Sequence, residues 1–310
     1  MRIPSFLRHS PASVAILAAL AVVVFAPSAA VAQSQATTGV IRGVASDSGG
    51  APVPAVTITV RNVATNFQRS VQTNESGAFA ATLLPLGTYE LTARRIGYRP
   101  LTRQGLVVRV GATVDLPLVL ARQATELSQV TVTAATPVID VSRVEAATQL
   151  SDEVVSGLPN NGRNYLNLTL LTPNVALASG PDGDELSIAG QRGIHNNVSV
   201  DGADFNNPFF GEQRGGQRPA FTFNLDAVQE MVVIANGANA EFGRSGGGFV
   251  NVITKSGTNT LHGSAHYYGK PGSLASDAEH AGIRNVPDFN QQQFGFTLGG
   301  PIVRDKAFFF

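Results

Sequence analysis

His262 and His266 lie four residues apart, and two histidines at this spacing could bind a metal ion together. On a helix this spacing would bring both imidazoles to one face, where they could bind zinc. The neighbouring residues alternate in a way that indicates a strand, and on a strand the two side chains lie too far apart to share a metal easily. The acidic run at residues 182–185 does not have EF-hand spacing, which favours a solvated turn over a calcium site.

Other chemistry is not indicated by the motifs. The glycine-rich run at residues 243–248 leads into a strand, so it is not a dinucleotide-binding fingerprint. Residues 263–270 end in Gly-Lys but lack the Ser or Thr of a phosphate loop, and no Gly-x-Ser-x-Gly elbow is present. The 310 residues contain no cysteine, and their net charge of +0 offers nothing to nucleic acid. We therefore expect no enzyme activity, no cofactor and no nucleic-acid partner.

Residues 1–32 have the pattern of a secretory signal peptide. Arg2 and Arg8 form a basic start, residues 14–25 are apolar, and Ala-Val-Ala at residues 30–32 is a cleavage site before Gln33. The apolar run is too short to span a bilayer comfortably, which disfavours the alternative of an uncleaved membrane anchor. We expect an exported mature chain that begins at Gln33.

Residues 38–120 have the pattern of a small β-sandwich, in which short strands alternate with turn sequences. Strands are expected at residues 40–44, 56–60, 78–83 and 86–93, with turns at residues 47–50 and 74–77. The region resembles the carboxypeptidase regulatory-like domain, which has a transthyretin-like fold, at Gly43, Asp47, Gly50, Pro52, Val53, Val56, Gly77, Phe79, residues 86–89 and residues 97–98. No histidine lies within it, so a zinc peptidase site is not expected there.

The most informative motifs after the sandwich lie in residues 191–255. Short apolar strands end in glycine or Asp-Gly, as in Val-Ser-Val-Asp-Gly at residues 198–202, which is typical of hairpins. Asn224 stands where a helix N-cap is expected, with Asp226 near the positive end of that helix. The glycines at residues 246–248 precede an apolar strand, where a turn followed by close packing favours residues without side chains.

These motifs, in this order, resemble the plug domain of TonB-dependent outer-membrane receptors. The shared features are Arg-Gly at residues 192–193, the run at residues 198–202, Ala-x-x-Glu-Phe-Gly at residues 238–243 and Gly-Gly-x-Val-Asn-Val-Ile-Thr-Lys at residues 247–255. The resemblance implies an α+β plug over residues 142–255 that blocks the lumen of a wide barrel. Within it, residues 165–171 are an apolar helix or strand ended by Pro173.

Between sandwich and plug, residues 121–141 are expected to be a linker. In the resembled family, an extended segment at this position, the TonB box, is offered to the inner-membrane-anchored protein TonB. The candidate residues are Val130, Thr131, Val132, Thr133 and Ala134, because a Val-Thr alternation with free backbone groups suits strand addition to a partner's sheet. The alternative is that the segment is simply the last strand or linker of the sandwich.

A loop at residues 204–223 is rich in aromatic residues, glycine and arginine. In a plug, loops toward the outside meet substrate first, so the candidate substrate-facing residues are Phe205, Asn206, Phe209, Arg214 and Arg218. Aromatic rings with arginines could hold a sugar, a peptide or an anionic chelate. The alternative is that the phenylalanines pack on the barrel wall and the arginines are solvated.

Residues 256–310 have the period-two pattern of membrane β-strands. Leu261, Gly263, Ala265 and Tyr267 share one face, and His262, Ser264, His266 and Tyr268 share the other. Phe294, Phe296 and Leu298 repeat the pattern opposite Gln293, Gly295 and Thr297, and a tight turn is expected at residues 299–306. Only 55 residues follow Lys255, whereas a plugged barrel has about 22 strands, so we expect an N-terminal fragment of a longer receptor.

We therefore predict a mainly β protein with a transthyretin-like β-sandwich, an α+β plug domain and the first strands of an incomplete transmembrane β-barrel. The resemblance implies a bacterial outer-membrane receptor, surrounded by outer-membrane lipid with its sandwich in the periplasm, that takes up a scarce large nutrient with energy delivered by TonB. Its extracellular ligand is not indicated. The alternative, from a different class, is an exported binding or adhesion module without transport, which would hold if the chain ended at Phe310.

Overall fold

The computed structural model describes residues 37–122, 130–133, 146–160, 163–180, 183–206, 224–238, 242–272 and 290–310. For residues 130–133, 179–180 and 183–184 it describes the backbone alone. The predicted signal peptide lies outside these residues. Among the helices in the described ranges, none has the length and apolar character needed to cross a membrane.

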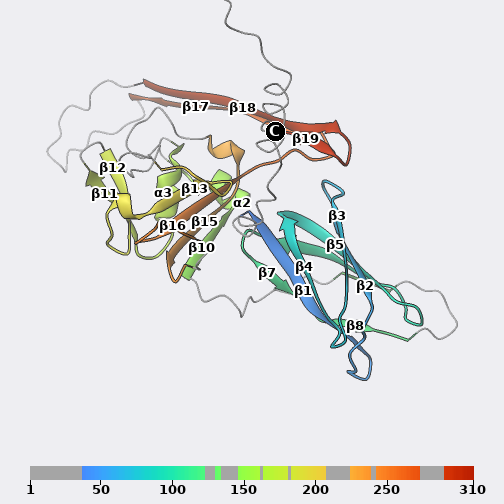
Figure 1. Ribbon diagram of the computed structural model, residues 1–310. Coiled ribbons are helices and arrows are strands. Elements are labelled where there is room, and N and C mark those ends of the chain that lie inside the picture. Colours follow the sequence, from blue (N-terminus) through green and yellow to red (C-terminus); the bar gives the residue numbers. More distant parts are fainter. Residues whose placement is uncertain are drawn as a thin grey trace, which may run out of the picture. The chain divides into compact units, whose positions relative to one another are not determined.

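The N-terminal region is a β-sandwich of two sheets (Figure 1). In the first sheet, β1 is flanked by three strands, antiparallel to β4 and parallel to β7 and β8. The second sheet has the order β3-β2-β5-β6-β9, and its last pair is parallel. The bounds are β1 Thr38–Asp47, β2 Thr57–Asn62, β3 Gln68–Gln72, β4 Ala78–Pro85, β5 Gly87–Arg94, β6 Leu101–Val108, β7 Thr113–Asp115, β8 Leu118–Leu120 and β9 Val130–Thr133.

Alternating apolar side chains hold the sandwich together. Ile58 and Val60 of β2 and Leu91 of β5 are fully buried in one hydrophobic cluster, as period-two alternation requires. Tyr89 is also fully buried, and its hydroxyl donates a hydrogen bond of 2.8 Å to the carbonyl of Pro85. The predicted turn at residues 74–77 is present, with Gly77 at φ +75°. The expected β-sandwich is therefore confirmed, with strands β3, β6, β7 and β8 in addition to those predicted.

The plug region is built on a second five-stranded sheet, of order β10-β15-β16-β13-β14. All neighbours are antiparallel except β13 and β16, which are parallel. Short helices and a separate two-stranded hairpin accompany the sheet. The bounds are β10 Ala146–Ser151, α2 Asp152–Gly157, α3 Tyr165–Thr169, β11 Val175–Gly180, β12 Gly183–Ile188, η2 Gly193–His195, β13 Asn197–Val200, β14 Ala203–Asp204, η4 Leu225–Ala227, β15 Val228–Asn236 and β16 Phe249–Thr254.

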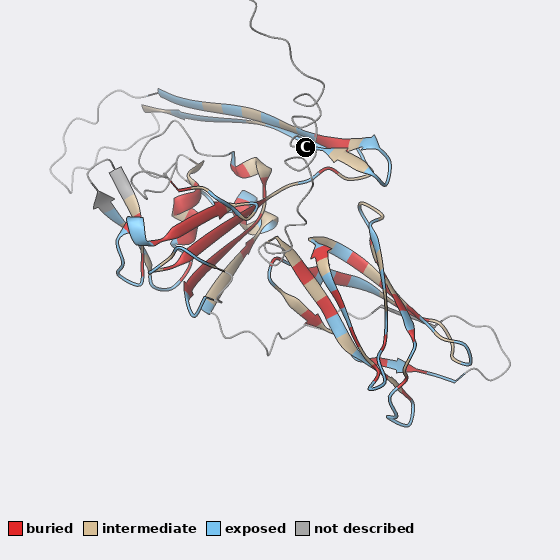
Figure 2. Ribbon diagram, in the orientation of Figure 1, coloured by how far each residue is buried: buried red, intermediate tan, exposed pale blue. Residues whose placement is uncertain are grey.

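The two central strands of this sheet are covered on both faces, and Figure 2 shows β15 and β16 buried along most of their length. Met231 and Val233 belong to one hydrophobic cluster, whereas Val232 and Ile234, which alternate with them, belong to another. The Asp-Gly turn predicted after β13 is confirmed, because Asp201 and Gly202 have φ values of +51° and +77° and connect β13 to β14. Two successive positive φ values are typical of a type I′ hairpin turn.

Three details of the plug refine the sequence prediction. Residues 165–169 resolve the helix-or-strand alternative as helix α3, which Asn164 caps by accepting from the Leu166 N–H. The acidic turn predicted at residues 181–185 does not include residues 183–185, because β12 already begins at Gly183. Its pairing with β11, from Gly180↔Gly183 to Val175↔Ile188, extends the strand into the acidic residues. Asn224 is a cap as predicted, although the element that it caps is the 3-10 helix η4.

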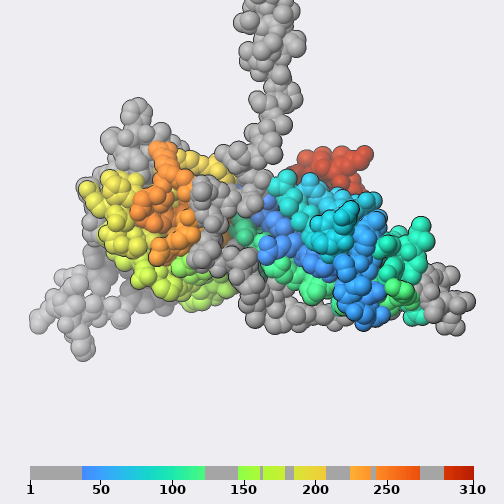
Figure 3. Space-filling model, turned by 60° about the horizontal axis from the view of Figure 1, so that its bottom comes forward, coloured from blue at the N-terminus to red at the C-terminus, as the bar shows by residue number. Residues whose placement is uncertain are grey.

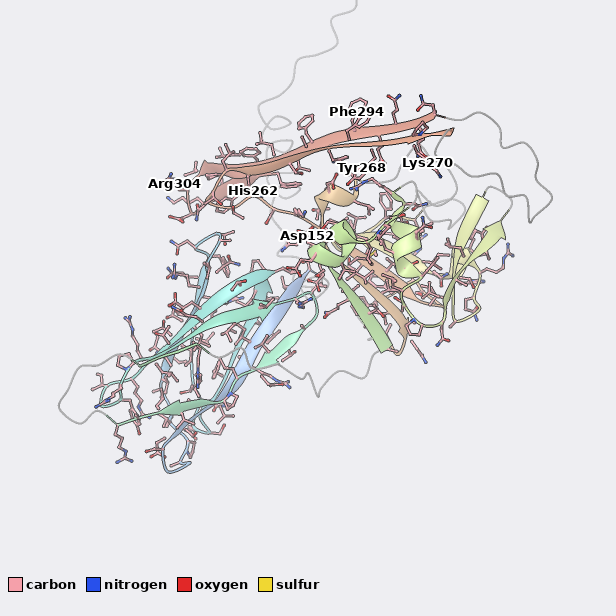
Figure 4. All side chains as sticks on the ribbon, turned by 180° about the vertical axis from the view of Figure 1, so that it is seen from behind. Asp152, His262, Tyr268, Lys270, Phe294 and Arg304 are labelled. Carbon is pink, nitrogen blue, oxygen red and sulfur yellow. The ribbon has the colours of Figure 1, made fainter. Side chains whose placement is uncertain are left out.

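The last region is a long antiparallel hairpin of β17 His262–Pro271 and β18 Asn290–Val303, followed by β19 Ala307–Phe309. Cross-strand partners confirm the predicted faces, since Tyr267 lies opposite Phe294 and Ala265 opposite Phe296. Phe294 and Phe296 are 81% and 80% exposed. Figure 4 shows Phe294 and Tyr268 on opposite faces of the hairpin. One face is therefore an apolar band, as expected for a strand pair that meets lipid.

The turn predicted at residues 299–306 is wrong in extent. β18 continues to Val303, and the turn occupies residues 304–306, closed by Lys306 N–H donating to the Val303 carbonyl. Pro301 lies inside the strand, opposite Phe308, where the register shifts before Val303. A proline cannot donate to a ladder but is tolerated at such an irregularity, which explains how the strand passes through Gly-Gly-Pro.

Candidate functional site

A buried asparagine joins three segments of the plug. Asn196, 2% exposed, donates from Nδ2 to the Leu186 carbonyl at 2.6 Å and accepts at Oδ1 from the Gly248 N–H at 3.0 Å. It thereby connects β12, the start of β13 and the entry to β16. Figure 3 shows the yellow and orange parts of the plug side by side on one face.

We expect Asn196→Ala to lower the free energy of plug unfolding by about 2–3 kcal/mol, because it leaves a buried carbonyl and a buried N–H without partners. Asn259→Ala is the matched control, since Asn259 also makes two hydrogen bonds, both to Asp305, but at an exposed site. Its cost should stay below about 1 kcal/mol. Chemical denaturation of the two variants measures the difference, and equal costs would show that Asn196 is not a structural hub.

The glycine triplet before β16 has unequal steric demands. A Cβ at Gly247 would overlap Asn196 Oδ1, and one at Gly248 would lie 2.7 Å from Ile188 Cδ1 and 2.8 Å from the Ile234 carbonyl oxygen. A Cβ at Gly246 would meet nothing within 4 Å. The predicted need for glycine is therefore confirmed at residues 247 and 248 and wrong at Gly246, where the chain passes through open space.

Two of the five candidate substrate-facing residues lie within the described part of the chain. Phe205 packs against the main plug cluster, and Asn206, 7% exposed, donates to Asn197 Oδ1 at 2.8 Å and accepts from the Val198 N–H. Both side chains thus help to hold β13. Phe209, Arg214 and Arg218 lie outside the described residues, so the interpretation of this loop as substrate-facing stays a prediction.

An ion pair links Asp204, the last residue of β14, to Arg244. Arg244 Nη1 donates to Asp204 Oδ2, and the Asn206 backbone N–H and side chain donate to Oδ1, each at 2.8 Å. Desolvation acts to raise the pKa of Asp204, but the hydrogen bonds from Asn206 and the charge of Arg244 outweigh it and lower the pKa below its ordinary value.

Because the folded-state pKa of Asp204 is lowered, this carboxylate stabilises the plug fully above its unfolded pKa of about 3.9, and the contribution is lost as the pH falls through the folded pKa. We expect Asp204→Asn to remove that part of the acid sensitivity. Unfolding followed by circular dichroism between neutral pH and about pH 3 would show it. If Asp204→Asn and the native protein lost stability in parallel on acidification, the Asp204 carboxylate would contribute nothing to the acid response.

The candidate TonB-contacting segment forms a strand. Residues 130–133 are β9, paired in parallel with β6 from Leu101↔Val130 to Gln104↔Thr133, and Ala134 lies outside the described residues. This pairing means that the region predicted as a linker contributes a strand to the sandwich sheet. Whether the segment also contacts TonB stays a prediction.

A cluster of four polar and aromatic side chains joins the plug to the hairpin. Arg163 donates to Asp226 Oδ1 at 2.6 Å, and His266 Nδ1 lies 2.8 Å from Asp226 Oδ2, off the direction of a good hydrogen bond. The guanidinium of Arg163 also stacks 4.8 Å from the ring centre of Tyr268. The three charged or polar side chains are only 12–17% exposed. The attraction between Arg163 and Asp226 is therefore poorly screened by water.

Two glycines of β18 make room for the histidines of β17. Gly295 lies opposite His266, and a Cβ on it would come within 2.7 Å of the imidazole Cε1. Gly299 lies opposite His262 in the same way, with a Cβ 3.0 Å from Nε2. Each imidazole can thus approach the backbone of the facing strand closely. His266 reaches Asp226 from this position, whereas His262 contacts Thr258 and Thr260.

The cluster was missed by sequence reasoning, which placed Asp226 at a helix end and His266 on the polar face of a strand. Arg163 and Asp226 are 63 positions apart, and no local pattern marks such a pair. In the ranges that the structure describes, no three His, Cys, Asp or Glu side chains gather as metal ligands would. The arrangement is suited to holding two structural elements together by charge.

Comparison with known proteins gives a consistent result for both ends of the chain. Residues 40–121 match the carboxypeptidase regulatory-like domain family, and residues 253–310 match an outer membrane beta barrel domain family. The TonB-dependent transporter Oar of Myxococcus xanthus is 30% identical over 300 residues, which cover 91% of this chain and 27% of Oar. The chain thus spans about a quarter of the length of this curated relative.

Solved structures of outer-membrane proteins are also similar over about half of the chain. The siderophore receptor PirA from Acinetobacter baumannii is 22% identical, with a TM-score of 0.39 over 52% of this chain and 23% of PirA. The outer membrane transporter YddB from Escherichia coli is 16% identical, with a TM-score of 0.41 over 51% of this chain and 24% of YddB. At such TM-scores neither likeness supports an argument.

The named relative is a transporter, which agrees with the prediction that the protein is not an enzyme. Its alignment covers 91% of the chain, so it includes sandwich, plug and hairpin residues. The two family models match the sandwich and the hairpin independently. Over nearly its whole length the chain is thus similar to a TonB-dependent transporter, with a carboxypeptidase regulatory-like domain at its N-terminal end and an outer membrane beta barrel sequence at its C-terminal end.

Proposed function

We propose that the complete protein takes up a scarce, large nutrient across the outer membrane with energy delivered through TonB. The observation that carries this proposal is the alignment with a TonB-dependent transporter across sandwich, plug and first barrel strands. A siderophore, an oligosaccharide and a peptide are the substrate classes in question. The alternative is an exported binding or adhesion module without transport, and a growth experiment distinguishes the two functions.

The order of elements supports a plug that is mechanically continuous with a barrel wall. β16, the second central strand of the plug sheet, ends at Thr254, and β17 begins at His262 after a described connection of seven residues. The hairpin then presents an apolar face to lipid and a polar face on which His266 contacts the plug residue Asp226. A pull that reaches the plug sheet would therefore act directly on its contact with the first barrel strand.

We place the TonB contact at residues 130–134 and the first contact with substrate on the loop around residues 205–218. Strand addition at residues 130–134 would use the backbone groups of the segment, so its sequence would matter mainly through its ability to stay extended. In the substrate loop, Phe209, Arg214 and Arg218 are the proposed contacts, since Phe205 and Asn206 already support β13.

Val132→Pro in the chromosomal copy tests this function, because proline removes a backbone donor from the segment. Val132→Thr is the matched control, since threonine keeps the β-branched shape and the N–H. Growth of the source bacterium is measured on ferric chelates, oligosaccharides and peptides as sole sources, alongside a deletion strain. We expect Val132→Pro to reproduce the growth defect of the deletion and Val132→Thr to grow as the native strain.

Immunoblots of the outer-membrane fraction confirm that each variant is present at the native level. If the deletion strain showed a growth defect and the Val132→Pro strain did not, this segment would not be the TonB contact. If the deletion strain showed no uptake defect but lost surface binding of a nutrient, the protein would be a binding module without transport.

A further inference from the structure

The sandwich sheet ends in a strand supplied by the proposed TonB-contacting segment. β9 is the last strand in the order β3-β2-β5-β6-β9, and each of its four residues has a direct partner in β6. These residues, Val130 to Thr133, are four of the five residues proposed to contact TonB. The sandwich edge and TonB would therefore use the same backbone.

The edge of β6 can hold only a short strand. Gly105 has a φ of +77°, and the register between β5 and β6 shifts, so that Gln104 and Gly105 together face Glu90. Such a bulge bends the strand and interrupts a straight edge. The pairing with β9 stops at Gln104, immediately before it. The seat, which we define as Leu101 to Gln104, is filled completely by the four residues of β9.

The seat is a protected part of the sheet. Leu101 and Thr102 are adjacent and point to opposite faces, yet they are only 6% and 2% exposed. Beyond them, Gln104 donates to Glu90 at 3.2 Å, and Glu90 pairs with Arg61 on the next strand. This ladder across β2, β5 and β6 fixes the strand that carries the seat. An empty seat would leave backbone groups of β6 open to water or to another strand.

We propose that the edge of β6 is a resting seat for the TonB-contacting segment, and that the sandwich and TonB bind this segment alternately. The inference rests on the proposed function, because it takes the TonB contact at residues 130–134 as given. Four parallel residues form a weak pairing, since each net backbone hydrogen bond contributes little. TonB can therefore displace it, and the fraction of free segment sets the apparent affinity for TonB.

An engineered disulfide tests the alternation in the full-length protein. Gln104→Cys and Thr133→Cys are directly opposite, and the 310 residues contain no native cysteine to compete. Binding of the purified periplasmic domain of TonB is measured by biolayer interferometry before and after reduction. We expect the oxidised double variant to bind at least about tenfold more weakly than the same sample after reduction. Each single-cysteine variant should bind equally under both conditions.

The outcomes are separable. If no disulfide forms, β9 does not occupy the seat and the inference is overturned. If the disulfide forms and binding is unchanged, TonB adds to the outer edge of β9 without displacing it, which also overturns alternation. If the native and the reduced proteins both fail to bind TonB, the proposed function at this segment fails, and the failure does not depend on the seat.

Amide hydrogen exchange of the native full-length protein provides a second readout without any substitution. With the periplasmic domain of TonB added, the amides of Leu101 to Gln104 that face β9 should exchange faster, because the seat is vacated. Addition of TonB to the outer edge of β9 would instead leave these amides unchanged or slow their exchange. The strands β2 and β5 serve as internal references, since neither pairs with β9.

Discussion

Full-length protein carrying Asp226→Ala is expected to open locally at η4 and in the middle of β17 far more often than the native protein. The substitution leaves Arg163 and His266 buried without the carboxylate that both approach. Breaking a buried pair in this way costs about 3–5 kcal/mol, and the 12–17% exposure of the side chains reduces this to about 2–3 kcal/mol. Amide hydrogen exchange should accelerate roughly 30- to 150-fold at these residues.

His262→Ala is the matched control for this prediction. His262 lies on the same face of the same strand and opposite a glycine, but its hydrogen-bond partners are Thr258 and Thr260. Its loss should change the local opening free energy by no more than about 0.5 kcal/mol. Equal acceleration in Asp226→Ala and His262→Ala would show that the hairpin is simply fragile and that the charge cluster does not hold it.

The double variant Asp226→Ala with His266→Ala separates direct contact from general damage. If the two side chains act as one unit, the second substitution adds little once the first is present, and the costs fall short of their sum by about 1 kcal/mol or more. Gly295→Ala should have a similar effect to His266→Ala, because its Cβ would displace the imidazole from its place over β18. Additive costs would place His266 outside the cluster.

The parts of the fold that the sequence predicts are those with a local signal. The hairpin of β17 and β18 shows period-two alternation, and the Asp201-Gly202 turn follows from residues that tolerate positive φ. β3, by contrast, reads Gln-Arg-Ser-Val-Gln and has no fully buried residue, so nothing in its composition marks a strand. β6 is interrupted by Arg-Gln-Gly at the bulge, which hides its alternation.

The contacts at the candidate site depend on long-range packing, which local patterns do not carry. Arg163 and Asp226 are brought together by the fold of the plug, and His266 reaches them only because Gly295 leaves space on the facing strand. Similarly, β9 has strand-forming residues, but its parallel partner β6 precedes it by about 30 positions with β7 and β8 in between. Sequence alone therefore predicts the strand and leaves its partner open.

Substitutions in the glycine triplet before β16, residues 246–248, have the second large expected effect. Their effect on plug stability differs in sign between Gly248 and Gly246. Gly248→Ala should cost about 1–3 kcal/mol of plug stability, because its Cβ would press on Ile188 and on the backbone of Ile234. Gly246→Ala should be neutral or stabilise the plug by up to about 1 kcal/mol, since its Cβ meets open space and alanine reduces the freedom of the unfolded chain. Exchange rates of the β16 amides measure both.

Gly247→Ala tests the link between the triplet and Asn196. Its Cβ would overlap Asn196 Oδ1, so we expect a cost of about 1–3 kcal/mol in the native background. In an Asn196→Ala background the overlapping atom is gone and the new methyl group fills part of the space, so the additional cost should fall by at least about 1 kcal/mol. A cost that is the same in both backgrounds would mean that Gly247 is required by its own backbone and not by the asparagine packed against it.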